Sequence, residues 1–79
     1  MIERIFAMKI RIELDTMSDV TDFVSIVTAV PGQVFLSDGK HQQICAKSQL
    51  GAILAKMEWD EIYCISDDDI SGSIVKWIV

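Results

Sequence analysis

The most constraining feature of this sequence is a stretch near its start in which every second residue is apolar. The apolar positions begin at Phe6 and end at Leu14, and charged side chains stand between them at Lys9, Arg11 and Glu13. A period of two is typical of a β-strand with one face on a core and the other in water. The chain therefore needs further elements that cover one face of a sheet.

Two later segments have the spacing of helices. Capping residues at 15–19 precede apolar residues that recur every three or four positions through residues 20–30, and Pro31-Gly32 ends this first helix. Ser48 precedes a second, shorter helix. We expect its apolar residues Ile53, Leu54 and Met57 to face the core, and Leu50 to be exposed together with Met17 across the loop.

The remaining segments complete the order of elements. Three further strands are expected, at residues 33–37, 41–45 and 62–65. Asp38-Gly39 is typical of a hairpin turn between the first two of these, and the second lies at the sheet edge. Three aspartates at 67–69 then open a third helix that reaches Ile78 and that Ser71-Gly72-Ser73 keeps short.

These signals follow the order βαββαβα, which predicts one α+β domain over residues 1–79. Because each helix is apolar on one side only, we expect a four-stranded antiparallel sheet with three helices on one face, an open-faced β-sandwich. Met1–Ala7 is a candidate N-terminal extension of the first strand, since Met8 is an equally good start for the fold. The side chains expected to point at the helices are Phe6, Ile10, Ile12, Val34, Leu36, Ile62 and Cys64.

Size and charge narrow the classes of function. A chain of 79 residues can barely bury one core, so we expect no deep substrate cleft and no catalytic centre. The net charge of −5 argues against nucleic acid as a partner. Neither a membrane-spanning run nor a signal peptide is visible, and we expect a cytoplasmic protein without a membrane partner.

The cysteines and tryptophans are expected to be structural. Cys45 and Cys64 lack the spacing of metal ligands, so we expect neither a metal nor a cofactor and interpret both thiols as small core residues. The alternative is a redox pair, which requires both side chains within disulfide reach. Trp59 and Trp77 are expected to anchor the two ends of the core.

Three short segments together resemble a known family. They are Asp38-Gly39-Lys40, Ala46-Lys47-Ser48-Gln49-Leu50-Gly51 and Asp60-Glu61-Ile62. In a βαββαβα chain of this length they resemble the histidine-containing phosphocarrier protein, HPr, of the bacterial sugar phosphotransferase system, from Met8 onward. The resemblance implies the HPr fold and a place in the phosphocarrier family.

The segment that carries phosphoryl transfer in that family is different here. The family has a phosphoacceptor histidine, an arginine and a proline where this chain has the stretch from Leu14 to Val20, and the histidine position falls on Thr16, Met17 or Ser18. None of these is an imidazole, and aspartates at 15, 19 and 22 would repel a phosphoryl group. The one histidine in the sequence, His41, is expected to be a solvent-exposed residue of the edge strand. The resemblance is therefore to a degenerate member without the phosphoacceptor.

Ser48 is the family feature that remains. Its residue type and position are typical of a helix N-cap. In HPr of Gram-positive bacteria the matching serine is also phosphorylated by a dedicated kinase, and the product docks on a transcriptional regulator; a catabolite-repression paralogue keeps this serine without the histidine. The resemblance thus makes Ser48 a candidate regulatory phosphorylation site. It makes a kinase or a transcriptional regulator the expected partner, and the candidate partner-binding residues are Met17, Lys47, Gln49 and Leu50.

Three functions are left open by the sequence. The first is a non-enzymatic HPr-like regulatory or adaptor protein that acts by binding a protein partner. The second is a phosphocarrier of the phosphotransferase system that uses an unorthodox residue. The third is an unrelated small interaction module that shares only the order of elements. The sequence favours the first and sets no oligomeric state.

Overall fold

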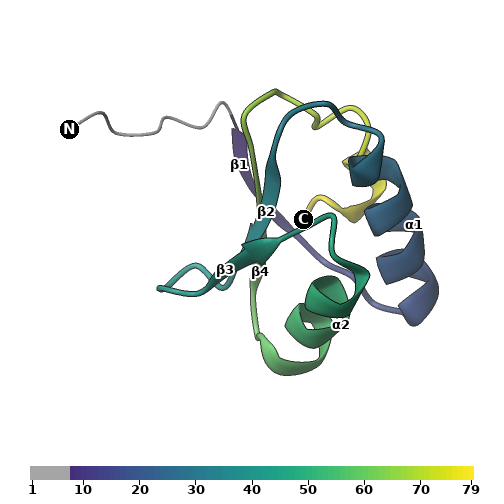
Figure 1. The fold of residues 1–79 in the computed structure, drawn as a ribbon. Coiled ribbons are helices and arrows are strands. Elements are labelled where there is room, and N and C mark those ends of the chain that lie inside the picture. Colours follow the sequence, from purple (N-terminus) through teal and green to yellow (C-terminus); the bar gives the residue numbers. More distant parts are fainter. Residues whose placement is uncertain (1–7) are drawn as a thin grey trace.

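The fold was analysed in a computed structural model, which describes residues 8–79; the predictions for Met1–Ala7, including the inward-facing Phe6, lie outside the described residues. Two helices, four strands and one short 3₁₀ turn follow in the described part of the chain (Figure 1). They are β1 (Met8–Ile12), α1 (Met17–Thr28), β2 (Val34–Ser37), β3 (Gln43–Cys45), α2 (Gln49–Glu58), β4 (Ile62–Ser66) and the turn η1 (Val75–Trp77).

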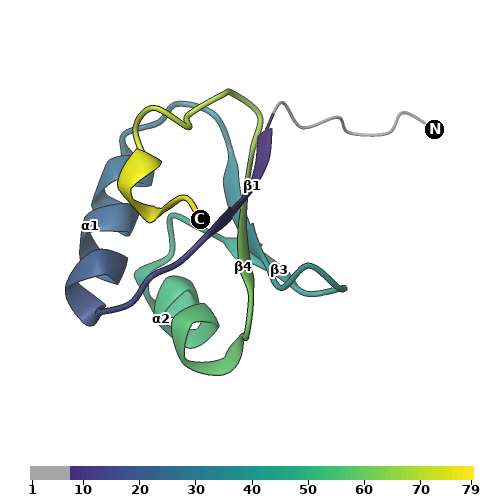
Figure 2. The ribbon, with the colours of Figure 1, turned by 180° about the vertical axis from the view of Figure 1, so that it is seen from behind.

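The sheet has the strand order β1-β4-β2-β3, and each neighbouring pair is antiparallel. Cys64 on β4 pairs with Ile10 on β1 and with Leu36 on β2, which fixes the register of the three long strands. Both helices lie on one face of the sheet, and the front and back views agree on this (Figures 1 and 2). The predicted α+β class, the antiparallel sheet and the single covered face are confirmed.

The alternation of the strands selects the buried face as predicted. Five of the six described residues that were expected to point at the helices are buried, and Ile10 is partly buried and packs on the core. Helix α1 covers them with the side chains of Val20, Phe23 and Val27, which are fully buried. A shift of one residue would expose this whole set, so burial pins the register.

The hairpin between β2 and β3 is built around one carboxylate. Asp38 Oδ1 accepts hydrogen bonds from the backbone N–H groups of Lys40, His41 and Gln42, at 2.8, 3.1 and 3.0 Å. Gly39 has φ = +80°, a conformation that side chains with a Cβ rarely adopt. The return strand β3 begins at Gln43, two residues later than predicted, and it is the edge strand as expected. His41 is exposed in the turn.

The predicted third helix is wrong. Residues 67–74 form turns: Asp69 Oδ1 accepts from both the N–H and the hydroxyl of Ser71, and the Ser66 hydroxyl accepts from the N–H of Asp68. Aspartate and serine side chains that bond to the nearby backbone in this way compete with helix formation. Only the short turn η1 follows these turns, and Ile78 is then bridged to Ile12 of β1.

The predicted inward face of α2 is wrong for two residues. Leu54 and Met57 are 47% and 69% exposed, and Ile53 is only partly buried. The residues that face the core are Ala52 and Ala55, whose small side chains let the helix lie close to the layer beneath. The alanines and the larger apolar residues both recur at helical spacing, so periodicity alone could not choose between these two faces.

Both cysteines were predicted to fill the core. The prediction is confirmed for Cys64, which is fully buried, and is wrong for Cys45, which is exposed. Both thiols are free. Cys45 pairs with Phe35 across β2–β3, whereas Cys64 pairs with the next residue of β2, Leu36. Successive strand residues point to opposite faces, so the two thiols lie on different sides of the sheet and the redox-pair alternative fails.

Candidate functional site

Ser48 lies directly before the first turn of α2 and is exposed. Its hydroxyl accepts a hydrogen bond from the N–H of Gly51 at 3.1 Å, and its carbonyl accepts from Ala52 N–H at 3.0 Å. The residue is extended, with φ = −87° and ψ = 116°. This is the geometry of an N-cap, so the capping role predicted for Ser48 is confirmed.

The first turn of α2 carries no acidic residue, and its glycine brings the helix close to β3. A Cβ at Gly51 would come within 3.1 Å of Ile44 Cδ1, so the start of the helix packs tightly on the edge strand. Gln49 and Leu50 of this turn are exposed. The positive end of the α2 dipole therefore faces solvent beside a hydroxyl group, without a carboxylate to neutralise it.

Lys47 has a different role from its neighbours. Its ammonium group donates a hydrogen bond of 2.6 Å to the carbonyl of Val30, just beyond the end of α1, and the side chain is partly buried. A cation is favourable at the negative end of a helix dipole. The Lys47 ammonium thus joins the end of α1 to the start of α2.

The start of α1 is capped by the side chains of Thr16 and Asp19. Thr16 is the N-cap: its hydroxyl accepts from the N–H of Asp19 at 3.0 Å, while Asp19 Oδ2 accepts from the N–H of Thr16 at 3.1 Å. The other carboxylate oxygen accepts from the indole Nε1–H of Trp77 at 3.2 Å. The Trp77 hydrogen bond, followed by those from Thr16, lowers the pKa of the Asp19 carboxyl. The carboxylate of Asp19 therefore occupies the N-terminal end of α1.

The structure divides the predicted partner-binding residues between two places. Lys47, Gln49 and Leu50 are contiguous with Ser48, and Lys47 touches the C-terminal end of α1. Met17 is 48% exposed, as predicted, but it is the first residue of α1. A helix of this length spans roughly 17 Å at about 1.5 Å per residue, so Met17 lies at the far end of α1 from Lys47.

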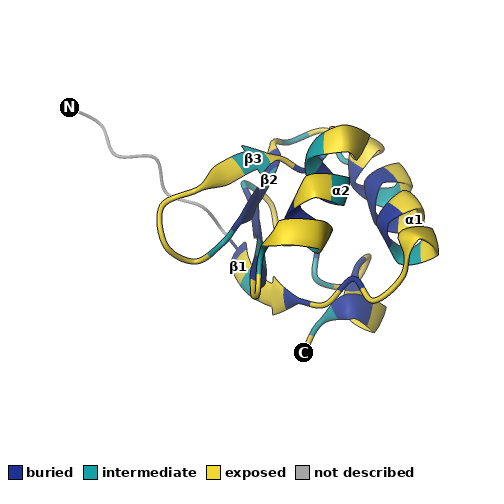
Figure 3. Cartoon of the chain, turned by 90° about the horizontal axis from the view of Figure 1, so that it is seen from below, coloured by how far each residue is buried: buried dark blue, intermediate teal, exposed yellow. Residues whose placement is uncertain are grey.

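One exposed apolar surface was only partly predicted: Leu50 was expected to be exposed, but Leu54 and Met57 were assigned to the core. Leu50, Leu54 and Met57 are 69%, 47% and 69% exposed. Viewed from below, α2 presents a largely exposed face to solvent (Figure 3). We call these three residues the α2 ridge. Three large apolar side chains gathered on one helix face are typical of a surface that another protein covers.

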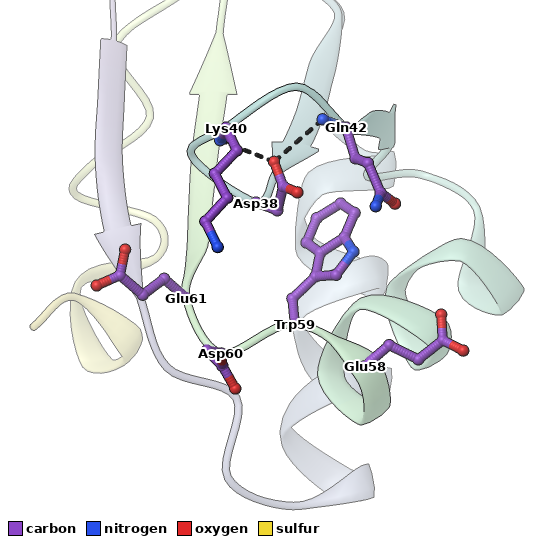
Figure 4. A pocket seen from close by; sticks show the side chains of 7 residues that line it. All are labelled: Asp38, Lys40, Gln42, Glu58, Trp59, Asp60 and Glu61. Atoms are coloured by element: carbon purple, nitrogen blue, oxygen red, sulfur yellow. Dashed lines mark hydrogen bonds between the residues drawn. The ribbon is translucent and has the colours of Figure 1, made fainter.

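A second feature that the sequence did not reveal is a cavity of about 390 Å³ at the C-terminal end of α2 (Figure 4). Its walls come from the β2–β3 turn and from the junction between α2 and β4. The indole of Trp59 rises from the junction toward the turn (Figure 4). We call this cavity the Trp59 pocket. Both tryptophans were predicted to anchor the core. Trp77 is 4% exposed and belongs to the core, whereas Trp59 is only partly buried.

Two findings concern the described residues as a whole. Neither α1 nor α2 combines the length and the apolar character that a bilayer-spanning helix requires. Within residues 8–79, no three histidine, cysteine, aspartate or glutamate side chains are grouped so that they could hold a metal ion.

Comparisons with protein-family models, with curated proteins and with solved structures gave no match.

Proposed function

We propose that this chain is an HPr-like regulatory or adaptor protein of the bacterial cytoplasm, which acts by docking on a protein partner and does not carry a phosphohistidine. The observation that supports the proposal is the contrast between the two helix starts. At α1 the position of the phosphoryl group is filled by the Asp19 carboxylate, which is bound on both oxygens. At α2 the Ser48 hydroxyl is exposed and its turn is free of acidic residues.

Phosphocarrier activity at the start of α1 has no chemical support in this arrangement. The Thr16 hydroxyl is the acceptor of the capping hydrogen bond, Met17 has no nucleophilic atom, and Ser18 offers a hydroxyl where the family uses an imidazole. His41, on the β2–β3 turn, donates its backbone N–H to Asp38 and belongs to a different part of the fold. A phosphoryl group near Asp19 would meet a like charge instead of a cation.

Phosphorylation of Ser48 is favourable by the same physics. A phosphate carries about −1.5 to −2 charges at neutral pH and is stabilised at the positive end of a helix dipole. The modification would change the charge two residues away from Leu50, at the start of the α2 ridge. It would thereby alter which partner the ridge can dock, which is a regulatory function without chemistry in the chain itself.

The test uses two phosphorylation reactions on the intact chain. With labelled ATP and an HPr serine kinase, we expect a label that the Ser48→Ala variant loses and that a Ser25→Ala control, altered at an exposed serine of α1, keeps. With phosphoenolpyruvate and the first enzyme of the phosphotransferase system, we expect no label. An acid-labile phosphoryl group from the second reaction would refute the absence of carrier activity, and a kinase label retained by Ser48→Ala would refute the assignment of Ser48.

A further inference from the structure

The exposed ridge of α2 leads directly into the Trp59 pocket. Leu50, Leu54 and Glu58 are four residues apart, so they form one row along the helix, with Met57 beside its end. Glu58 lines the pocket, and Trp59 follows it as the C-cap of the helix. An apolar row that ends in an acidic residue and an indole is one continuous surface.

The pocket is acidic around its aromatic wall. Four of its lining side chains are carboxylates, from Asp38, Glu58, Asp60 and Glu61, and one is a cation, from Lys40. The side chain of Lys40 reaches from the turn toward Asp60 and Glu61 (Figure 4). The cavity therefore has an excess of negative charge.

The protein uses only part of this charge itself. Asp38 accepts three backbone N–H groups of the turn, and Glu61 accepts from the Tyr63 hydroxyl at 3.2 Å. Among residues 8–79, no hydrogen bond or ion pair engages the carboxylates of Glu58 and Asp60. The two carboxylates nearest Trp59 in sequence are thus available to a ligand.

From this arrangement we propose that a basic amphipathic helix of the protein partner docks on α2, with its apolar face on the ridge and an arginine guanidinium in the Trp59 pocket. The inference rests on the proposed docking function and names the chemistry of the partner. A guanidinium stacks on an indole by cation–π attraction and donates to carboxylates in a planar fork. The cavity volume is within the ~300–1,000 Å³ range of small-ligand sites.

Charge selects this occupant over others. The chain has a net charge of −5, and four carboxylates against one lysine line the pocket, so an acidic partner segment is repelled there. A purely apolar partner would cover the ridge but would leave the carboxylate of Glu58 without a partner. A basic partner satisfies both parts. Its arginine competes with Lys40 and, at Glu61, with Arg11, whose guanidinium lies 3.9 Å from that carboxylate.

The experiment compares two synthetic amphipathic helices that are identical except for one residue. Both carry leucines on one face; the first has a single arginine at the end of that face, and the second has citrulline, its neutral isostere. Binding to the full chain is measured by titration of the Trp59 indole N–H signal in NMR. We expect the arginine peptide to bind at least about threefold more tightly, the smallest effect expected of an exposed cation–π contact with carboxylates beside it.

Variants separate the pocket from the ridge. Glu58→Gln should reduce the preference for arginine, and Lys40→Gln should increase it because a competing cation is removed. Leu54→Ala should weaken both peptides equally. If these two side chains only supported the fold, the Lys40→Gln and Glu58→Gln variants would not change the preference for the arginine peptide in opposite directions.

Each contrary result overturns a defined statement. Equal binding of the two peptides would refute the arginine pocket, while labelling of Ser48 would leave the proposed function standing. Failure of both peptides to bind would refute the docking surface. Self-association of the free chain that Leu54→Ala abolishes, measured by sedimentation, would assign the ridge to a second copy and refute the proposal. Arginine preference without labelling of Ser48 would retain the pocket and refute the phosphorylation switch.

Discussion

Truncation of Trp77 to alanine tests whether the C-terminal turn belongs to the core. The Trp77 ring is 4% exposed and meets Phe23 edge to face, with ring centroids 5.5 Å apart and an interplanar angle of 81°. Its indole N–H is also the hydrogen-bond partner of Asp19, on the first turn of α1. Trp77→Ala therefore removes core volume, an aromatic contact and the link between the chain end and α1.

The expected loss is large for a domain of this size. Truncation of a buried tryptophan to alanine costs about 3–5 kcal/mol in the free energy of unfolding. At ~0.05–0.15 kcal/mol per residue, a chain of 79 residues has a total stability of about 4–12 kcal/mol. The variant should thus lose between a quarter and all of it, and its melting temperature should fall by at least about 12 °C.

The assay is urea unfolding followed by far-UV circular dichroism, with Trp59 fluorescence as a second probe. The matched control is Val75→Ala in the same turn, at a residue that is 66% exposed, where we expect a change within about 0.5 kcal/mol. If the two variants had the same unfolding midpoint, the turn would not be part of the core and the packing argument would be refuted.

Three further predictions follow from the hairpin and the cysteines. Gly39→Ala should destabilise the fold by more than about 1 kcal/mol, because φ is +80° and the new Cβ would lie 2.6 Å from the tyrosine ring of β4, whereas Gly72→Ala, in open space, should be neutral or slightly stabilising in the same urea assay. The backbone N–H groups of the turn, first that of Lys40, lower the pKa of Asp38. The contribution of the Asp38 carboxylate to folding stability is therefore present above about pH 4 and is lost as the pH falls through the lower pKa of the folded state. The Asp38→Asn variant lacks this carboxylate, so its urea midpoint should fall less on acidification than that of the parent chain. Burial raises the pKa of Cys64 to about 12, so a thiol reagent at neutral pH should label Cys45 alone in the native protein and both thiols only in urea; rapid native labelling of both would contradict this burial.

The parts of the fold that were predicted correctly are those with a strong local signal in the sequence. The alternation in β1 and β2 determined which residues of these strands face the helices, because burial of one face leaves a single acceptable register. The capping role of Ser48 also followed from its residue type directly before an apolar helical repeat. Of the candidate site, the exposure of Leu50 and Met17 was predicted, and these residues are indeed exposed.

The parts that sequence reasoning missed depend on contacts between distant residues. The sequence alone determined where α2 lies but could not decide whether its alanines or its larger apolar residues would face the sheet. The tertiary structure chose the alanines, because they let the helix approach closely, and so left Leu54 and Met57 in solvent. The hydrogen bond between Asp19 and Trp77 joins residues 58 positions apart. The Trp59 pocket likewise exists only because the β2–β3 turn folds over the end of α2, and no local pattern specifies that meeting.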